Sequence, residues 1–301
     1  MLVRALVLSQ PSHPSALSHL SAASGLVRSG DRLFVVADDE LHLGVFPAAG
    51  DAPGHLVRLF EGDLPAAKPA RKQRKPDLEA LTLLPPMPSY PHGALVALGS
   101  GSTPQRCRGI VLGLDAGGDL SGQRRIFDLE PLYRKLGSHF AELNIEGATI
   151  ASGELNLFQR GNIGQPLNGV ARFPLTALID AMEHRLTEAI EPIDVHAIDL
   201  GRLGNVPYSI TDATALPDGR TLVTAVAEET EDSYADGACL GAMIAVLSTD
   251  WLVERRFVLD GARKIEGVWA NVAGHRAELM LVTDADDPSI AASLFSATIR
   301  L

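Results

Sequence analysis

The chain has 301 residues and a formal net charge of −11 at pH 7, so no broad positive field is available to recruit a nucleic acid. Hydrophobic residues make up 46% and charged residues 21% of the chain, which is typical of a folded globular protein and not of a disordered one. No apolar run approaches the roughly 18 residues that a membrane-spanning helix needs, so no membrane partner is expected.

The two cysteines, Cys107 and Cys239, have no spacing that indicates a metal site or a disulfide framework. Two thiols in a chain of this length are typical of a reducing compartment, so the sequence predicts a cytoplasmic protein. All-β architectures often use chains of this length for one domain, and no linker interrupts the sequence. Residues 1–301 are therefore expected to form a single β-propeller domain, for the reasons that follow.

The N-terminal segment is the first predicted element. Residues 2–8 are mostly apolar, but Arg4 interrupts them, so the stretch is too short for a signal peptide and is interpreted as a β-strand. The first complete unit follows it. Its apolar stretches, bounded by turn residues, predict four consecutive strands at residues 24–28, 33–37, 42–46 and 55–60.

The rest of the chain repeats the start of this unit. Five segments share an acid or hydroxyl residue, then a small residue and an apolar stretch; the motif begins at Ser24, Glu79, Glu146, Thr211 and Glu266. These positions lie 55, 67, 65 and 55 residues apart, and 59 residues lead from the last through the chain ends to the first. About 60 residues per unit suits a four-stranded propeller blade. The sequence therefore predicts an all-β fold, a five-bladed β-propeller.

The last unit has three candidate strands, which leaves its outer position unfilled. The N-terminal segment has no partner of its own. We therefore expect residues 2–8 to supply the outer strand of the fifth blade, which closes the ring and covers an exposed sheet edge.

Two segments have apolar residues at helical spacing, Leu129 to Leu143 and Leu175 to Ile190. They predict two short helical insertions whose apolar faces pack on neighbouring blades. The two longest intervals of the repeat contain residues 100–145 and 160–205. A six-bladed propeller with one degenerate blade hidden there is the alternative.

The repeat predicts a ring of polar side chains at one mouth of the central channel, because the first strand of each blade lines that channel. The five residues of the ring are Ser24, Glu79, Glu146, Thr211 and Glu266. Three carboxylates this close would repel one another unless one is protonated or a cation lies among them. Carboxylate and hydroxyl oxygens suit calcium, with magnesium as the alternative ion. The competing interpretation is that these acids accept hydrogen bonds from backbone amides.

In each blade the connection from the second to the third strand returns to the same mouth, where binding residues are expected. Glycines, hydroxyls and basic side chains there could hold an oxyanion such as phosphate; the candidates for substrate binding are Ser100, Ser102, Arg106, Arg108 and Arg160, together with Lys264. A basic run at residues 68–75 leads into Glu79 and is expected near the same mouth. The candidate general bases are Asp38, Glu228 and Asp286.

The order of the ring residues resembles that of the calcium-activated nucleotidase (apyrase) family, five-bladed propellers whose channel calcium is bound by a Ser, Glu, Glu, Ser, Glu series. This chain has Thr211 at the fourth position, where the family has Ser. The resemblance implies a calcium ion at the ring residues. The short Glu-Gly-apolar motif is also similar to that of phytase-like and esterase-like propellers, which have six blades. As a whole, the sequence looks most like an uncharacterised bacterial propeller family.

Two functions follow from this pattern. The first is a calcium-dependent hydrolase of phosphate esters or anhydrides, in which the channel cation orients water and the basic residues neutralise developing charge. The second is a non-catalytic propeller that binds a small anionic ligand or a protein partner, with a structural cation. In either case the expected partner is a small anion, and a nucleic acid is not expected to bind. The protein is expected to be a monomer.

Overall fold

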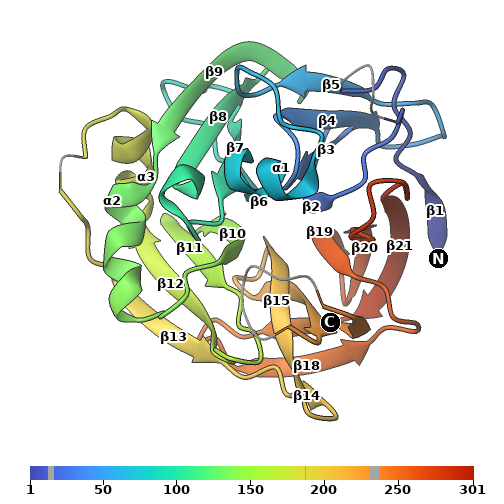
Figure 1. Cartoon of the computed structure of the whole chain (residues 1–301). Helices are drawn as coiled ribbons and strands as arrows, with labels where there is room; N and C mark the ends of the chain where they lie inside the picture. Colours follow the sequence, from blue (N-terminus) through green and yellow to red (C-terminus); the bar gives the residue numbers. More distant parts are fainter. Residues whose placement is uncertain (13–16, 187, 231–236) are drawn as a thin grey trace.

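The computed structural model describes residues 1–12, 17–186, 188–230 and 237–301. These residues form five small antiparallel sheets arranged in a ring (Figure 1). The predicted all-β five-bladed propeller is therefore confirmed. Residues 100–145 and 160–205 contain strands of the second, third and fourth blades and helical segments, so the six-bladed alternative is wrong.

The first three blades each have four strands in chain order from the channel outward. Blade one has β2 (Ala23–Ser29), β3 (Arg32–Ala37), β4 (His42–Pro47) and β5 (His55–Arg58). Blade two has β6 (Leu78–Leu84), β7 (Ala94–Gly99), β8 (Arg108–Leu114) and β9 (Leu120–Asp128). Blade three has β10 (Ile145–Ala151), β11 (Glu154–Gln159), β12 (Asn168–Pro174) and β13 (Asp194–Ile198).

The last two blades depart from this plan. Blade four has a short additional strand, and its sheet consists of β14 (Arg202–Leu203), β15 (Val206–Ala215), β16 (Thr221–Glu228), β17 (Cys239–Leu247) and β18 (Val253–Val258). Blade five takes three strands from the end of the chain and one from its start: β19 (Ile265–Ala273), β20 (Arg276–Thr283), β21 (Ser293–Arg300) and β1 (Leu2–Ala5).

Strand β1 closes the ring, as predicted, by pairing antiparallel with β21. It ends at Ala5, earlier than the expected residue 8; Leu6 still donates to the carbonyl of Ala292, just before β21, and the chain then leaves the edge of blade five. The next residues contact blade one instead: Val7 pairs with His19, and Leu8 pairs with Gly54. One N-terminal segment thus joins the last blade to the first, which removes the open edge at the seam.

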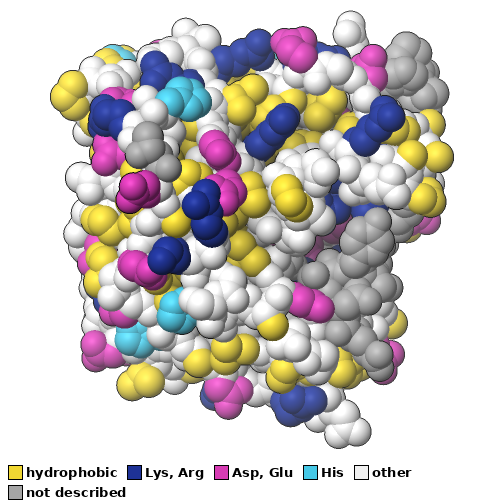
Figure 2. All heavy atoms as spheres, turned by 60° about the vertical axis from the view of Figure 1, so that its left-hand side comes forward, with side chains coloured by type: hydrophobic (Ala, Val, Ile, Leu, Met, Phe, Trp, Pro, Cys, Tyr) yellow, Lys and Arg dark blue, Asp and Glu magenta, His cyan; other side chains and the backbone are white. Residues whose placement is uncertain are grey.

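Three short α-helices accompany the sheets in the described residues. Helices α2 (Glu130–Tyr133) and α3 (Leu175–Met182) fall in the two segments predicted to be helical, and a 3₁₀ helix, η2 (Arg134–Ser138), extends α2. Their apolar side chains, such as Leu132 and Leu178, pack with residues of blades two and three in one buried cluster. On the face that carries α2 and α3, basic and acidic side chains are interspersed (Figure 2).

The remaining helical segments lie close to the channel mouth. A 3₁₀ helix, η1 (Pro104–Arg106), precedes β8, and α1 (Lys68–Arg74) lies in the connection from blade one to blade two. In Figure 1, α1 is near the middle of the ring beside β6. None of the helices in the described ranges has the length and apolar character needed to cross a bilayer.

The inner strands touch one another around the channel: β2 contacts β6, β6 contacts β10, β10 contacts β15, β15 contacts β19, and β19 contacts β2. This close approach explains why a small residue follows the motif residue. A Cβ added to Gly147 would lie 2.9 Å from the backbone nitrogen of Ala213, and one added to Gly25 would lie 3.2 Å from that of Leu81. Glycine at these positions lets neighbouring blades pack against each other.

Candidate functional site

A β-bulge marks each of the five motif residues. In all five blades the pairing between the first and second strands shifts its register across one residue, and the skipped residues are Ser24, Glu79, Glu146, Thr211 and Glu266. A bulge leaves the extra residue outside the ladder and changes the direction of its side chain. The repeat read from the sequence therefore corresponds to one backbone feature at the same place in every blade.

A cavity of about 80 Å³ opens at this end of the channel. Four of the five ring residues line it, as do all three candidate bases and three of the six candidate substrate-binding residues; they are Ser24, Glu79, Glu146, Glu266, Asp38, Glu228, Asp286, Arg106, Arg160 and Lys264. The cavity also has walls formed by Lys72, Lys75, Asp77, Asn144, Gly161, Asn162, Thr230 and Asp284.

Four predicted site residues do not line this cavity. Thr211 is fully buried, and its hydroxyl donates a hydrogen bond of 2.6 Å to the carbonyl of Ile265. Ser100 donates to the carboxylate of Asp77, and Ser102 accepts a hydrogen bond from Arg106. Arg108 is exposed at the start of β8. The two serines thus lie behind the cavity wall and hold residues that form it.

Blade four differs from the others at the residue after the motif. Asp212 stands where the other blades have Gly or Ala, and its side chain is buried. Its carboxylate accepts hydrogen bonds of 2.7 Å from the backbone amides of Ala213 and Val268. The interpretation that an acid accepts from backbone amides thus fits Asp212, although the sequence analysis applied it to the motif residues themselves.

A second set of cavity residues lies two positions before the motif residues. Asp77, Asn144 and Lys264 hold this position in blades two, three and five, and all three line the cavity. The sequence analysis missed Asp77 and Asn144. Aligning the position two residues before the motif across the five units would have found them, because that position is polar in blades two, three and five.

One side of the cavity is an ion-pair cluster formed by Arg160 and Lys264 with four acids. The Arg160 guanidinium bonds Glu228 and lies 3.4 Å from Glu146 and 3.6 Å from Glu266. The Lys264 ammonium lies 2.8 Å from Asp286, 3.6 Å from Glu266 and 3.7 Å from Glu228. Positive side chains of the protein therefore lie among the ring glutamates, where the sequence predicts a metal ion.

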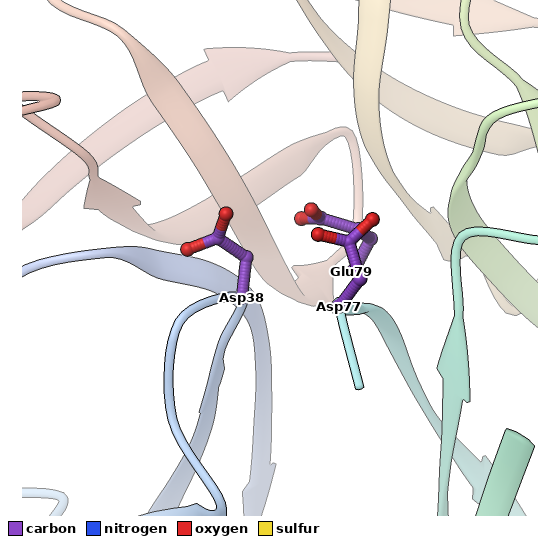
Figure 3. A group of neighbouring side chains, drawn as sticks. All are labelled: Asp38, Asp77 and Glu79. Atoms are coloured by element: carbon purple, nitrogen blue, oxygen red, sulfur yellow. The ribbon is translucent and has the colours of Figure 1, made fainter. Parts of the chain in front are cut away.

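The other side is an acidic triad formed by Asp38, Asp77 and Glu79. Within the described ranges, these three acids form a group whose ligand oxygens all lie within 4.8 Å of one another. Figure 3 shows the carboxylates of Asp77 and Glu79 close together, with Asp38 opposite them on blade one. Asp77 has a φ of 56°, a left-handed conformation that Asp adopts more readily than most residues. The triad shares only Glu79 with the predicted ring.

Two basic side chains contact the triad. The Lys75 ammonium bonds Asp38 and lies 2.7 Å from Asp77, and the Arg106 guanidinium also lies 2.7 Å from Asp77. Glu79 has no hydrogen-bond or ion-pair partner in the part of the chain that the structure describes. Negative charge in the triad is therefore only partly compensated.

Burial and neighbouring charges shift the pKa values of these groups. Burial raises the pKa of Glu79 well above its ordinary value, and the carboxylates of Glu146, Asp77 and Asp38 raise it further. Burial disfavours the charged form of Arg160, but Glu146, Glu266 and Glu228 outweigh it and raise the pKa of Arg160. Burial also raises the pKa of Glu146 and of Glu266, although Arg160 and Lys264 lower both. The cations of the ion-pair cluster therefore offset part of the cost of burying its glutamates, whereas three neighbouring acids add to the cost of a charge on Glu79.

One buried acceptor also lacks a hydrogen bond. Glu266 is only 4% exposed, it lines the cavity, and its Oε1 has no hydrogen-bond partner. The nearest cations, on Arg160 and Lys264, are 3.6 Å away. A buried polar atom without a partner is costly. This oxygen therefore favours a ligand in the cavity that is a cation or a hydrogen-bond donor.

The fold and the cavity define a class of protein: a five-bladed β-propeller with a charged site at one mouth of its channel. The chain belongs to a family of unknown function (DUF6929), whose profile matches residues 19–299. A family without an assigned function agrees with the expected uncharacterised propeller family. The nucleotidase, phytase and esterase resemblances gain no support from this match.

Among solved structures, the chain is similar to hydrazine synthase of Kuenenia stuttgartiensis, with 10% identity and a TM-score of 0.40 over 96% of this chain and 65% of that one. It is also similar to a luciferin-regenerating enzyme, with 10% identity and a TM-score of 0.46 over 92% and 91% of the two chains. A Bacteroides thetaiotaomicron protein thought to be a phosphatase has 10% identity and a TM-score of 0.46 over 94% and 62%.

The chain spans less than two thirds of the hydrazine synthase and Bacteroides chains. No activity is transferred from these three proteins. No curated protein matches the sequence. The cytoplasmic location, the monomeric state, the small anionic partner and the calcium ion stay predictions.

Proposed function

We propose that the cavity binds a divalent cation, calcium in the first instance, through the acidic triad, and that the chain is a cation-dependent hydrolase of phosphate esters or anhydrides. The acidic triad carries this proposal. Three carboxylates from two neighbouring blades lie within 4.8 Å of one another, and Glu79 among them has no partner in the described residues. Carboxylate oxygens suit calcium, whose flexible coordination accepts added water; magnesium is the alternative ion.

The charge of the cavity supports cation binding. Eight acidic and five basic side chains line it, which leaves an excess of three negative charges if all are ionised. The unpartnered oxygen of Glu266 lies in the same cavity. A divalent cation would lower the repulsion that now raises the pKa of Glu79.

The remaining residues suit the chemistry of a phosphoryl group. When bound, the cation would supply Lewis acidity toward a phosphoryl oxygen or a water molecule. Lys72 and Arg106 line the same cavity as the triad and could neutralise charge on a phosphate. Of the three candidate bases, Asp38 would be a cation ligand and Glu228 is bonded to Arg160. Asp286 is also paired, with Lys264 at 2.8 Å, but its side chain is 26% exposed against 3% for that of Glu228, so it is the more accessible to water and the better placed to take a proton from it.

The experiment is a calcium and a magnesium titration of chelator-treated protein, by calorimetry and by thermal unfolding. A ligand that binds only the folded state stabilises it by about 2.7 kcal/mol at 100 times its dissociation constant. We expect calcium to raise the melting temperature of the natural protein. Glu79→Gln should weaken calcium binding at least tenfold, by about 1.4 kcal/mol.

The matched control is Glu61→Gln, which removes one carboxylate from a side chain that is 84% exposed. It should leave calcium binding unchanged. Absence of both a heat of binding and a thermal shift in the natural protein would remove the basis of the proposal. Calcium-dependent turnover of a phosphate monoester or nucleoside diphosphate, lost on chelation, is the expected catalytic readout.

A second function, a non-catalytic site with a structural cation, is favoured by the state of the basic side chains. Lys75, Arg106, Arg160 and Lys264 all pair with carboxylates. Their charges are therefore already compensated inside the protein, which weakens their attraction for a substrate anion. Calcium binding with a thermal shift but without turnover of any phosphate ester would favour this function.

A further inference from the structure

Lys75 occupies part of the space in which the proposed function places the cation. It follows directly after α1, and its side chain is buried at the channel mouth, where the residue is 8% exposed. The ammonium bonds Asp38 and lies 2.7 Å from Asp77. These are two of the three carboxylates of the acidic triad.

A divalent cation and the Lys75 ammonium would use the same oxygens. Each carboxylate would have to turn from one cation to the other, and two positive charges held a few ångströms apart repel each other. Binding of a metal ion at the triad therefore requires the Lys75 side chain to move away. The protein thus already contains a cation at the site, built into its own chain.

The segment that carries Lys75 can release this side chain without leaving the channel mouth. Arg71 holds α1 to blade one by donating to the carbonyl of Asp39 at 3.1 Å, and it also donates to the carbonyl of Pro65, in the connection that precedes α1, at 3.0 Å. Arg106 holds the same helix by donating to the carbonyl of Lys72 at 2.9 Å. Because these contacts do not involve the Lys75 side chain, only its flexible stem needs to change conformation.

The ammonium also leaves part of the negative charge uncompensated. Glu79 completes the triad and has no partner in the described residues. The Oε1 atom of Glu266, on the other side of the cavity, has no hydrogen bond either. Lys75 and Arg106 bring two positive charges to three carboxylates, and neither pairs with Glu79 in the described residues, so a divalent cation can compete with the ammonium.

We propose that Lys75 is an intramolecular cation that competes with the divalent cation for Asp38 and Asp77. Metal binding displaces the ammonium, and the displaced side chain, with Lys72 nearby in the same cavity wall, then binds the phosphoryl group of a phosphate monoester. The site would thereby present its lysine to the substrate only after the metal is bound. This inference depends on the proposed function, because it assigns the order of binding at the same site.

The test is the calcium affinity of Lys75→Met, measured by calorimetry on chelator-treated full-length protein. Removing the competitor should tighten calcium binding at least tenfold. Arg74→Met is the matched control, since it removes one positive charge from an exposed side chain of α1 that does not line the cavity. Its effect on calcium affinity should be less than threefold. Lys75→Arg, which keeps the charge, should leave the affinity close to that of the natural protein.

A second measurement, of phosphate-ester affinity, should change in the opposite direction to the calcium affinity. In calcium-saturated protein, Lys75→Met should weaken the binding of glycerol phosphate at least fivefold, because the displaced lysine is the proposed contact. Tighter calcium binding together with weaker phosphate-ester binding supports the exchange. Thermal unfolding of each variant verifies that it is folded before the titrations are compared.

The outcomes separate this inference from the proposed function. If the natural protein binds calcium and Lys75→Met binds it equally or more weakly, the exchange is wrong and the metal site stands. If Lys75→Met binds calcium and the natural protein does not, the lysine blocks the site permanently, which supports the competition and overturns the proposed function. If neither folded protein binds calcium or magnesium, both are wrong.

Discussion

The two sides of the cavity carry residues of opposite charge at the same position of the repeat. In blade five, Lys264 stands two residues before Glu266, and it pairs with acids of the ion-pair cluster. In blade two the corresponding residue is Asp77, which adds a carboxylate beside Glu79 and creates the acidic triad. Every acid of the ion-pair cluster therefore has a basic partner, whereas Glu79 in the triad has none among the described residues.

The difference shows how one repeated β-bulge can contribute either to an internal ion-pair cluster or to a candidate cation site. The free-energy cost of burying carboxylates is smaller where a guanidinium lies between them, because the geometry of Arg lets one side chain bond several acids. Arg160 does this for three glutamates. Where compensation is partial, the buried acids cost stability but retain affinity for an added cation. Variants that remove a basic side chain or a carboxylate from either side of the cavity test this comparison.

The largest effect is expected from Arg160→Met. This change leaves Glu146, Glu228 and Glu266 without their guanidinium, and breaking a buried ion pair from one side costs about 3–5 kcal/mol. We expect the midpoint of urea unfolding to fall strongly. Arg160→Lys should lose less, because it keeps the charge but not the fork. Equal stability of Arg160→Met and the natural protein would show that the cluster does not stabilise the fold.

An intermediate effect should distinguish two glutamates at equivalent bulges. Glu146→Gln removes a charge that lies 3.4 Å from Arg160, and we expect a loss of about 1–3 kcal/mol in the free energy of unfolding. Glu79→Gln, measured without metal, removes a charge that its surroundings disfavour, so stability should be unchanged or higher by about 1 kcal/mol. Parallel urea unfolding of both variants in chelator checks the contrast. A loss of similar size in both would remove the distinction between the two sides.

The smallest effect on stability is expected from removing the hydroxyl of Thr211. Thr211→Val removes the donor that bonds the carbonyl of Ile265 at 2.6 Å, which should cost about 1–2 kcal/mol. It should leave calcium affinity unchanged, because Thr211 does not line the cavity. Thr211→Ser, which keeps the hydroxyl, serves as the control. A calcium affinity reduced tenfold in Thr211→Val alone would instead support the metal ring predicted from the sequence.

The repeat made much of this arrangement predictable. Spacing of the motif residues predicted five blades, and the unpaired N-terminal segment predicted the closure of the last one. Propeller geometry then placed distant loop residues, such as Asp38 and Asp286, at one mouth, where both line the cavity. These predictions succeed because the position of a residue within a blade determines which end of the channel it reaches.

Pairing among the side chains was not predictable in the same way. Arg160 and Lys264 were expected to bind a substrate anion, but Arg160 bonds Glu228 of blade four, and Lys264 pairs with Asp286 of its own blade. Asp77 carries no motif signal of its own, and Lys75 was only part of a basic run. Their contacts depend on the side-chain directions set by the bulges and by the course of the segment that contains α1, and neither has a signature in local sequence.

The number of blades, the closure of the ring and the end of the channel at which polar residues gather can all be predicted from the amino-acid sequence, because they follow from the order and spacing of a repeated motif. The pairing of the charged side chains depends on the folded arrangement. Five blades bring residues distant in the chain within a few ångströms of one axis, and at such distances small differences in position determine whether a carboxylate meets a guanidinium, an ammonium or another carboxylate.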